Sequence, residues 1–274
     1  MTRPLRWLAE RALLVFAGLV AAAMLVPIAV IALFSFGETP KGRLTFSFDG
    51  FTTEYWADAF AIPALNEALV TSLLLATAST VVAVTIGTLM ALGLVRRRFL
   101  GQRLTNLLIV LPMATPELVI GAALLSMFIN YAAPLGFATL FAAHVMFSIG
   151  FVVVVVRSRL IGFDRELENA AADLGASPAT TFRTVMLPLL APAIGAAAFM
   201  AFVLSLDDFV ISNFNSGSTV TFPLYVFGAV RTGIPVQVNV LATIMFLLTA
   251  LAAGVVLWQQ HRAQRLAVRR RRPA

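Results

Sequence analysis

The sequence predicts an all-α membrane protein with six transmembrane helices, and three observations support this fold class. Hydrophobic residues make up 60% of the 274-residue chain and charged residues only 12%, about half the charge of an average soluble domain. Apolar runs recur along the whole chain, and each is long enough to cross the roughly 30 Å hydrocarbon core of a bilayer as a helix. The basic residues are concentrated in alternate connections between these runs.

Six apolar segments are candidate spans, because a helix of about 20 residues crosses a bilayer. In chain order they cover residues 12–34, 68–95, 104–129, 134–156, 189–211 and 236–258. The first is too long for the apolar region of a signal peptide and is expected to remain as an uncleaved anchor. The third contains Pro112 and Pro116, whose missing N–H groups predict a kink. Residues expected to allow close helix packing are Gly87, Gly93, Gly121 and Gly150.

The basic residues predict the orientation of the chain. Seventeen of the 20 lie before the first span, between the second and third, between the fourth and fifth, or after the sixth. Because cytoplasmic connections are enriched in Lys and Arg, both termini and the connection 157–188 are predicted to be cytoplasmic. The arginine-rich tail from Arg262 fits a segment beside the membrane that meets anionic lipid, so nucleic acid is not expected as a partner.

Two connections are predicted to lie on the outer side. In the first, residues 51–60 are expected to form a short helix on the membrane surface, either as a solvated connector or as a docking element for a partner. In the second, the run 221–233 is too apolar for a plain loop. It is expected either to form a short helix or to dip back toward the membrane.

The cytoplasmic connection 157–188 is predicted to contain two short helices. Asp164 is a suitable N-cap for the first helix, and Gly175 suits the left-handed position after its end. Ser177 followed by Pro178 is typical of the start of a second helix. One face of the first helix is apolar at helical spacing, through Leu167, Ala170, Ala171 and Leu174. A small, partly apolar helix on a membrane-protein loop predicts a docking surface.

Residues 168–188, ENAAADLGASPATTFRTVMLP, resemble the EAA loop of the permeases of bacterial ABC importers. The family pattern is Glu-Ala-Ala, three residues, Gly, nine residues, then Ile-x-Leu-Pro. With Gly175 aligned, the positions that correspond to this pattern are Ala170, Ala171, Val185, Leu187 and Pro188. Asn169 departs from the pattern where the family has Glu, and Glu168, one residue earlier, is a candidate substitute. The resemblance implies that this loop inserts into a groove of a cytoplasmic ATPase.

Residues 111–125 and 206–241 are similar to the permease subunits of spermidine and putrescine importers. Together with the EAA-like loop, this similarity covers about residues 74–257. The resemblance implies the six-helix fold of the MetI-like permeases and a heterodimer with a second permease. It also implies two cytoplasmic ATPase subunits, which bind ATP and magnesium, and an extracytoplasmic solute-binding protein. The chain is therefore expected to be a single, multi-pass domain of a bacterial inner membrane over residues 1–274.

Three carboxylates lie within or at the edge of apolar segments: Glu117, Asp207 and Asp208. Each would cost about 2.5–3.5 kcal/mol at the centre of a membrane helix. Such residues usually face a cavity, a transport pathway or a partner, and the aspartate pair would attract a cation. Phe209 and Tyr225 nearby are candidates for cation–π contacts. The alternative is that the acids cap helix ends or accept hydrogen bonds from backbone donors.

Catalytic and metal sites are not expected in this chain. A P-loop needs the sequence GxxxxGK[ST], but the chain has a single lysine, Lys41, in a predicted outer connection. Without cysteine and with only His144 and His261, no metal-ligand cluster is predicted. His144, within an apolar span, is expected to be a hydrogen-bonded packing residue rather than a proton relay. ATP hydrolysis is therefore assigned to a separate subunit, and no cofactor to this chain.

The sequence thus predicts the inner-membrane permease subunit of an ATP-driven importer, with a polyamine as its cargo. One alternative is the same machine with another small solute, such as iron or thiamine. A second is a proton- or sodium-coupled secondary carrier that uses the three in-membrane carboxylates. A third is a membrane scaffold or sensor that transports nothing.

Overall fold

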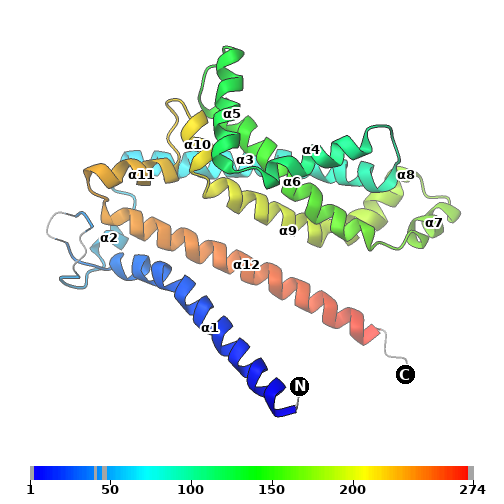
Figure 1. The fold of residues 1–274 in the computed structure, drawn as a ribbon, viewed down its shortest axis with the longest axis horizontal. Helices are drawn as coiled ribbons and strands as arrows, with labels where there is room; N and C mark the ends of the chain where they lie inside the picture. The colour runs from blue at the N-terminus through cyan, green and yellow to red at the C-terminus, as the bar shows by residue number, and fades with distance from the viewer. Residues whose placement is uncertain (1–2, 40–41, 45–47, 271–274) are drawn as a thin grey trace. The chain divides into compact units, whose positions relative to one another are not determined.

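The computed structural model describes residues 3–39, 42–44 and 48–270, and within these ranges the chain is almost entirely helical. Lys41, Arg271 and Arg272 lie outside the described residues. The described residues form no β-strand, only two isolated bridges. The elements, labelled in Figure 1, are α1 (Arg3–Phe34), α2 (Glu54–Ala57), α3 (Pro63–Arg96), α4 (Gln102–Ala114), α5 (Glu117–Asn130), α6 (Phe137–Ile161), α7 (Glu166–Asp173), α8 (Pro178–Thr181), the π-helical turn η1 (Phe182–Met186), α9 (Leu187–Leu206), α10 (Val210–Asn215), α11 (Phe222–Thr232) and α12 (Val236–Arg270).

Five of the predicted spans correspond to helical segments that are long and apolar enough to cross a membrane. Among the described residues these are Arg11–Phe34, Pro63–Arg96, Phe137–Ile161, Pro178–Leu206 and Val236–Val256. The third predicted span, 104–129, is instead two helices, α4 and α5, that meet at 112°. It makes a sixth span if this bent pair crosses the membrane as one. The described residues therefore contain five predicted spans as continuous helices, and the remaining predicted span is a sharply bent pair of helices.

The break in the third segment has a local cause in proline chemistry. Pro116 lacks an N–H group and disfavours a helical conformation at the residue before it. Thr115 is accordingly extended, with φ −90° and ψ 136°, and α5 starts directly after Pro116. Pro112 lies inside α4 without ending it. The predicted kink is therefore a complete helix break at Pro116, and Pro112 does not interrupt the helix.

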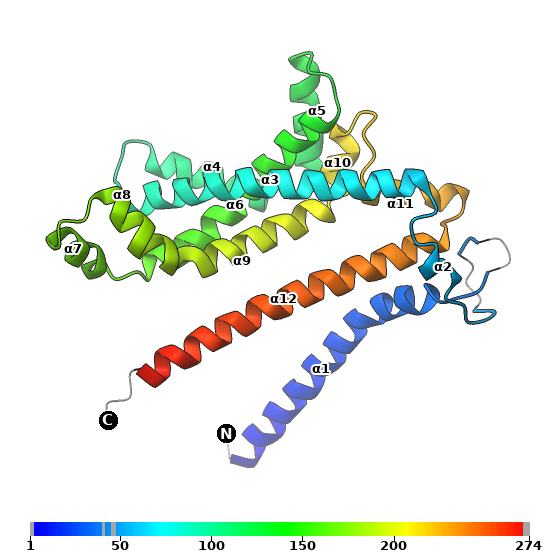
Figure 2. The same ribbon diagram turned by 180° about the vertical axis from the view of Figure 1, so that it is seen from behind.

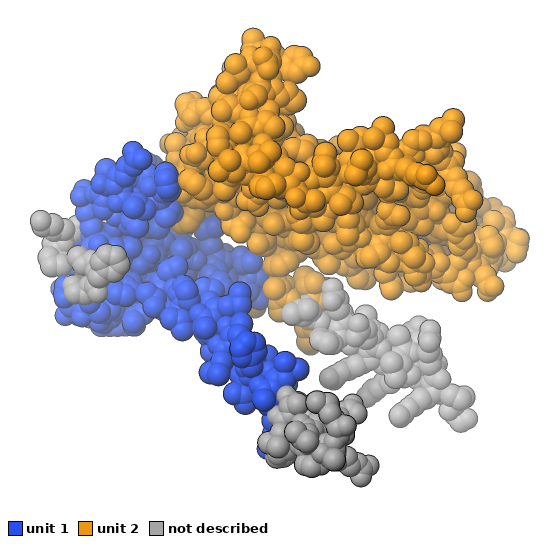
Figure 3. Space-filling model, viewed as in Figure 1, with its two compact units in different colours: residues 1–65, 226–250 blue, residues 66–225, 251–274 orange. Residues whose placement is uncertain are grey.

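The chain divides into two compact units, coloured in Figure 3. Unit 1 comprises Met1–Leu65 and Val226–Ala250, and unit 2 comprises Asn66–Tyr225 and Leu251–Ala274. In unit 1, no residue in the apolar Arg11–Phe34 stretch of α1 is buried within the chain. The predicted outer helix at 51–60 is the single turn α2, and the run 221–233 forms the helix α11.

The connections of unit 1 are joined by a small set of polar and aromatic contacts. Arg43 donates from Nη1 to the carbonyl oxygen of Thr232 at 2.6 Å, and the backbone N–H of Leu44 donates to Ile234. The ring of Phe36 stacks against two other rings, those of Phe51 and Trp56, with centroids 5.4 and 4.9 Å away. These contacts link the connection after α1 to the segment between α11 and α12 and to α2.

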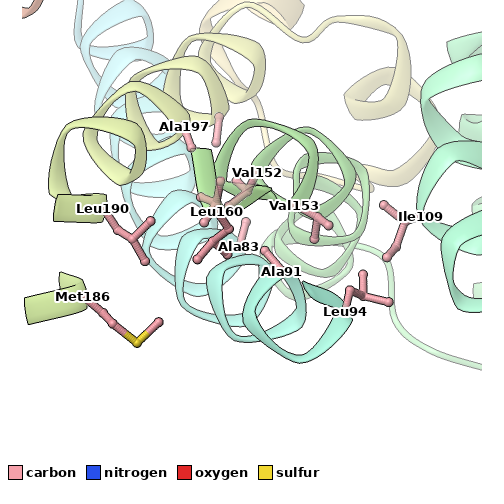
Figure 4. Packing of buried hydrophobic residues seen from close by; sticks show 12 residues of the cluster. Ala83, Ala91, Leu94, Ile109, Val152, Val153, Leu160, Met186, Leu190 and Ala197 are labelled. Atoms are coloured by element: carbon pink, nitrogen blue, oxygen red, sulfur yellow. The ribbon is translucent and has the colours of Figure 1, made fainter. Parts of the chain in front are cut away.

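The core of unit 2 lies where α3, α6 and α9 meet. Its centre is small and apolar, as Figure 4 shows for Ala83, Val152, Leu190 and Ala197, among others. α6 packs closely against α9 and α4, and in Figures 1 and 2 α3, α6 and α9 run side by side. This bundle carries the α7–α8 connection at one end and α5 and α10 toward the other.

Three of the four glycines predicted to allow close packing do so. A Cβ on Gly87 would lie 2.7 Å from Cγ1 of Val152, and one on Gly150 would lie 2.7 Å from the carbonyl oxygen of Ile109. A Cβ on Gly121 would lie 2.8 Å from the ring of Phe214. Gly93 has no neighbour within 4 Å of such a Cβ, so the prediction for that position was wrong within this chain.

Candidate functional site

The connection between α6 and η1 is a helix–turn–helix, as predicted. Gly175 has φ +79°, the left-handed conformation. The N–H of Gly175 donates to Ala172 and that of Ala176 to Ala171, which is the Schellman arrangement that ends a helix. The hydroxyl of Ser177 accepts from the N–H of Thr180 at 3.2 Å, which caps α8. Local chemistry alone therefore builds this turn.

The start of α7 differs slightly from the prediction. The N-cap position is occupied by Arg165 rather than Asp164. Asp164 still contributes, because its Oδ1 accepts from the N–H of Glu166 at 3.0 Å. The carboxylate thus satisfies a free N–H donor of the first turn from the residue before the N-cap.

The predicted apolar face of α7 is open to solvent in this chain. No residue of α7 is buried, and Leu167 and Leu174 are 47% and 89% exposed. Ala170 is exposed and Ala171 half-buried. Two exposed leucines on one face of a short helix and its C-cap are unusual for a solvated loop, and they are the kind of surface that a partner covers.

Glu168 does not point into solvent. Its carboxylate forms an ion pair with Arg96, the last residue of α3. The guanidinium of Arg96 also lies 5.8 Å from the ring centroid of Phe163, and Arg165 donates to the carbonyl oxygen of Val95 at 3.4 Å. α7 is therefore tied to the end of α3. Asn169, at the family's Glu position, is exposed.

The last residues of the EAA-like pattern lie where the connection becomes a membrane helix. Val185 is in η1, and Leu187 and Pro188 begin α9. In η1 the N–H of Leu187 donates to the carbonyl oxygen of Phe182, five residues earlier. Such a widened turn makes room next to a proline, whose ring would otherwise clash with the preceding turn. Leu187 and Pro188 are exposed.

Two of the predicted in-membrane acids lie at helix breaks of unit 2. Glu117 is the first residue of α5, just after the Pro116 break, and Asp207 is the C-cap of α9, just before α10. Both are exposed. α5 and α10 pack together, where the amide of Asn215 donates to the carbonyl oxygen of Gly121 at 3.3 Å.

Asp208 is used differently from its neighbour. Its side chain is only 5% exposed. Oδ1 accepts from the N–H of Ile211 at 3.2 Å, and Oδ2 accepts from both the N–H and the hydroxyl of Ser212 at 2.8 Å. Oδ2 also lies 3.4 Å from Nε2 of His144. These contacts match the helix-capping alternative that the sequence left open.

His144 is a buried, hydrogen-bonded residue, which confirms its prediction as a packing residue. It is 2% exposed. Nδ1 lies 2.7 Å from the hydroxyl of Ser205, and Nε2 lies 3.0 Å from that of Ser212. Ser205 is in turn 3.1 Å from Ser79 of α3. The sequence did not indicate these partners, because they come from helices far apart along the chain.

The two aromatic candidates are less clearly placed at this site. Phe209 lies in the break between α9 and α10, and Tyr225 is in the first turn of α11. Both side chains are half-buried. Among the described residues, no group of three or more His, Cys, Asp or Glu side chains could hold a metal ion.

Comparisons with known proteins agree with this arrangement. Residues 83–265 match the family described as binding-protein-dependent transport system inner membrane component. The chain is 37% identical over 235 residues to the spermidine/putrescine transport system permease protein PotC of Haemophilus influenzae, covering 85% of this chain and 90% of the relative. It is 34% identical over 251 residues to the putrescine transport system permease protein PotI of Escherichia coli, with coverage of 89% and 88%.

Solved structures show the same fold. A bacterial ABC transporter that imports alginate superposes with a TM-score of 0.65 at 15% identity, over 96% of this chain and 99% of that one. The methionine ABC transporter MetNI superposes with a TM-score of 0.54 at 14% identity, over 71% and 95%. The fold is that of the MetI-like permeases, a multi-pass protein of the bacterial inner membrane and a transport subunit. The chain belongs to the family of binding-protein-dependent transport system inner-membrane components.

Proposed function

We propose that the chain is a permease subunit of an ATP-driven importer that translocates polyamines such as spermidine and putrescine. The observation that carries the proposal is the similarity to PotC and PotI over more than four-fifths of the chain. The chemistry of unit 2 is consistent with it, because the exposed ionisable groups at its two helix breaks, Glu117 and Asp207, are acids. A path for anions would more naturally present arginines or helix N-termini.

The proposed cargo path runs past these two breaks. Glu117 and Asp207 attract the cationic nitrogens of the cargo, and Phe209 and Tyr225 add contacts through their ring faces. Asp208 directly follows Asp207 in the chain. The path needs only weak, transient binding, because tight binding would slow release. In this scheme an extracytoplasmic solute-binding protein supplies most of the selectivity and delivers the cargo.

The other subunits follow from the exposed loop. The apolar face of α7, with Leu167 and Leu174, docks into a groove of a cytoplasmic ATPase. Two such ATPase subunits bind ATP and magnesium, since this chain carries no P-loop. A second, similar permease completes a heterodimer, and both termini of this chain are cytoplasmic.

Transport proceeds by alternating access in this proposal. ATP binding closes the ATPase dimer and displaces α7 and α8 on each permease. The membrane helices then open outward to receive cargo from the binding protein, and hydrolysis returns them to the inward-facing state. A coupling free energy between the nucleotide sites and the cargo path is required, and it must pass through α7 and the helices attached to it.

The decisive experiment is uptake of labelled spermidine and putrescine in cells that lack this chain, with and without its restoration. Uptake that disappears, returns, and depends on ATP rather than on the proton gradient supports the proposal. Uptake that is abolished by an uncoupler while ATP is maintained identifies a secondary carrier instead. Polyamine uptake that is untouched by the deletion refutes the cargo assignment, and iron, thiamine and other small solutes are then screened in the same cells.

A further inference from the structure

A buried polar network surrounds the break between α9 and α10. His144, Ser205, Ser212 and Ser79 are all at most 5% exposed, and the Asp208 side chain is equally buried. These residues come from four elements, namely α3, α6, α9 and the start of α10. The main core cluster of this unit is apolar, so a connected group of buried polar side chains beside it calls for a specific reason.

The imidazole of His144 bridges the break. Its Nδ1 contacts Ser205, two residues before Asp207, and its Nε2 contacts Ser212, five residues after Asp207. One rigid ring on α6 thereby holds the end of one helix and the beginning of the next. The hydroxyl of Ser205 also lies within hydrogen-bond distance of Ser79 on α3, so the contacts of His144 extend to a third helix of the bundle.

Asp208 has little capacity left for a cargo molecule. One oxygen accepts from the N–H of Ile211, and the other from Ser212 twice, with His144 alongside. A bound cation would have to displace these donors, and the first turn of α10 would then lose its only side-chain acceptor among the bonds described here. Asp207, in contrast, is exposed.

We propose that His144 and Asp208 are positioning residues, which fix the break between α9 and α10 so that, of the two aspartates, only Asp207 presents its carboxylate to the cargo. The neighbouring aspartates therefore have separate roles: Asp208 supports the backbone, and Asp207 meets the cation. The part that concerns cargo rests on the proposed function. The part that concerns the break does not, because it follows from the hydrogen bonds of this chain.

The chain has no cysteine, so single-cysteine variants report local accessibility without interference from its own sequence. The reporter is Ile211→Cys, since Ile211 is 1% exposed and its N–H is held by Asp208. The probe is a cationic methanethiosulfonate reagent applied to the complete importer in membranes. We expect slow labelling of this reporter, and faster labelling by about 10-fold when His144→Ala or Asp208→Asn is added, because donors and acceptors at the break are then left unpaired.

A matched control lies one helical turn away on the same helix. Ser148 is also buried, at 1%, and its hydroxyl has no hydrogen-bond partner in the described structure. Ser148→Ala is therefore expected to leave the labelling rate unchanged. His144→Gln keeps a side-chain donor and acceptor, so its labelling rate should lie between those of the unmodified protein and His144→Ala. If the His144→Ala protein does not reach the membrane, His144→Gln is used in its place.

A second measurement separates cargo contact from positioning. Spermidine carries three positive charges and putrescine two, so loss of a cargo-binding carboxylate should lower spermidine uptake more than putrescine uptake. We expect Asp207→Asn to change this ratio. His144→Ala and Asp208→Asn should lower both uptakes in the same proportion, and the double variant should be no worse than the more severe single one, because both residues act through one network.

Two results would overturn the inference. One is a spermidine-to-putrescine ratio that Asp208→Asn shifts as strongly as Asp207→Asn does, because Asp208 would then contact cargo. The other is unchanged labelling of Ile211→Cys in the His144→Ala background. If the unmodified importer takes up neither polyamine, the proposed cargo is refuted, while the labelling experiment still decides whether His144 and Asp208 hold the break.

Discussion

The carboxylate of Glu168 in α7 pairs with the guanidinium of Arg96 at the end of α3, 72 residues earlier in the chain. Both side chains are about four-fifths buried, and Arg96 also lies against the ring of Phe163. The short helix that carries the exposed leucines is therefore attached to the bundle by a specific contact. Its orientation depends on that contact as well as on the two ends of the connection.

Charge exchange tests this attachment. Arg96→Glu or Glu168→Arg should lower ATP-dependent uptake about 5-fold or more, because each places two like charges together where the side chains are largely buried. The combined variant Arg96→Glu/Glu168→Arg should recover much of the loss. Glu166→Arg, at an exposed position of the same helix, is the control and should have little effect. Failure of the double variant to improve on the single ones would show that the pair is not the relevant contact.

Gly175→Asp should abolish uptake while the protein remains in the membrane. Gly175 has φ +79°, a backbone conformation that residues with a side chain rarely adopt. A Cβ added at this position would have no neighbour within 4 Å. The change therefore spares the packing of the chain but distorts the turn and adds charge to the surface that meets the partner. Gly175→Asn is the control, because asparagine tolerates this conformation best. Membrane immunoblots and uptake assays read the outcome, and normal uptake by Gly175→Asp would contradict the docking role.

Leu174→Glu should weaken the association of the ATPase subunits with the permease. The side chain is 89% exposed, so its replacement costs this chain little stability. Loss of its burial in a complex should cost about 1–3 kcal/mol of binding, equivalent to a weakening of about 5- to 150-fold. Leu100→Glu, a fully exposed leucine of the α3–α4 connection, is the matched control. Co-purification of the ATPase gives the result, and equal recovery with both variants would place the docking surface elsewhere.

Gly150→Val should destabilise unit 2 by about 1–3 kcal/mol, because overpacking a tight helix contact strains backbone and side chains. A Cβ at this position would lie 2.7 Å from a backbone oxygen of α4, which cannot move aside easily. The melting temperature of the detergent-solubilised importer should fall accordingly. The control is Gly195→Ala in α9, because a Cβ added there has no neighbour within 4 Å. This variant should melt within about a degree of the unmodified protein.

Features set by neighbouring residues were predictable from the sequence. The end of α7 at Gly175 and the start of α8 at Ser177 and Pro178 depend on the chemistry of a few adjacent residues. The spans follow from hydrophobicity, because backbone groups in lipid must be paired within the helix. These features need no knowledge of the tertiary structure.

Features set by distant residues were not predictable. Arg96 was used only as an indicator of orientation, although it is the partner of Glu168. The equivalence assumed for Asp207 and Asp208 is another example, since only the tertiary structure brings His144 and Ser212 to the second of them. The angle at Pro116 also depends on where α5 finds its packing partner, α10. Proline predicts that a helix is disturbed but not how far it turns.

α9 connects the two candidate sites directly. It begins at Leu187, within the EAA-like pattern, and its C-cap is Asp207. At 1.5 Å per residue, its 20 residues span about 30 Å. Under the proposed function, a displacement of the α7–α8 connection would tilt this helix and carry the motion to the acid at its other end. The π-helical turn η1 directly precedes this helix, so that displacement would reach the acid through η1.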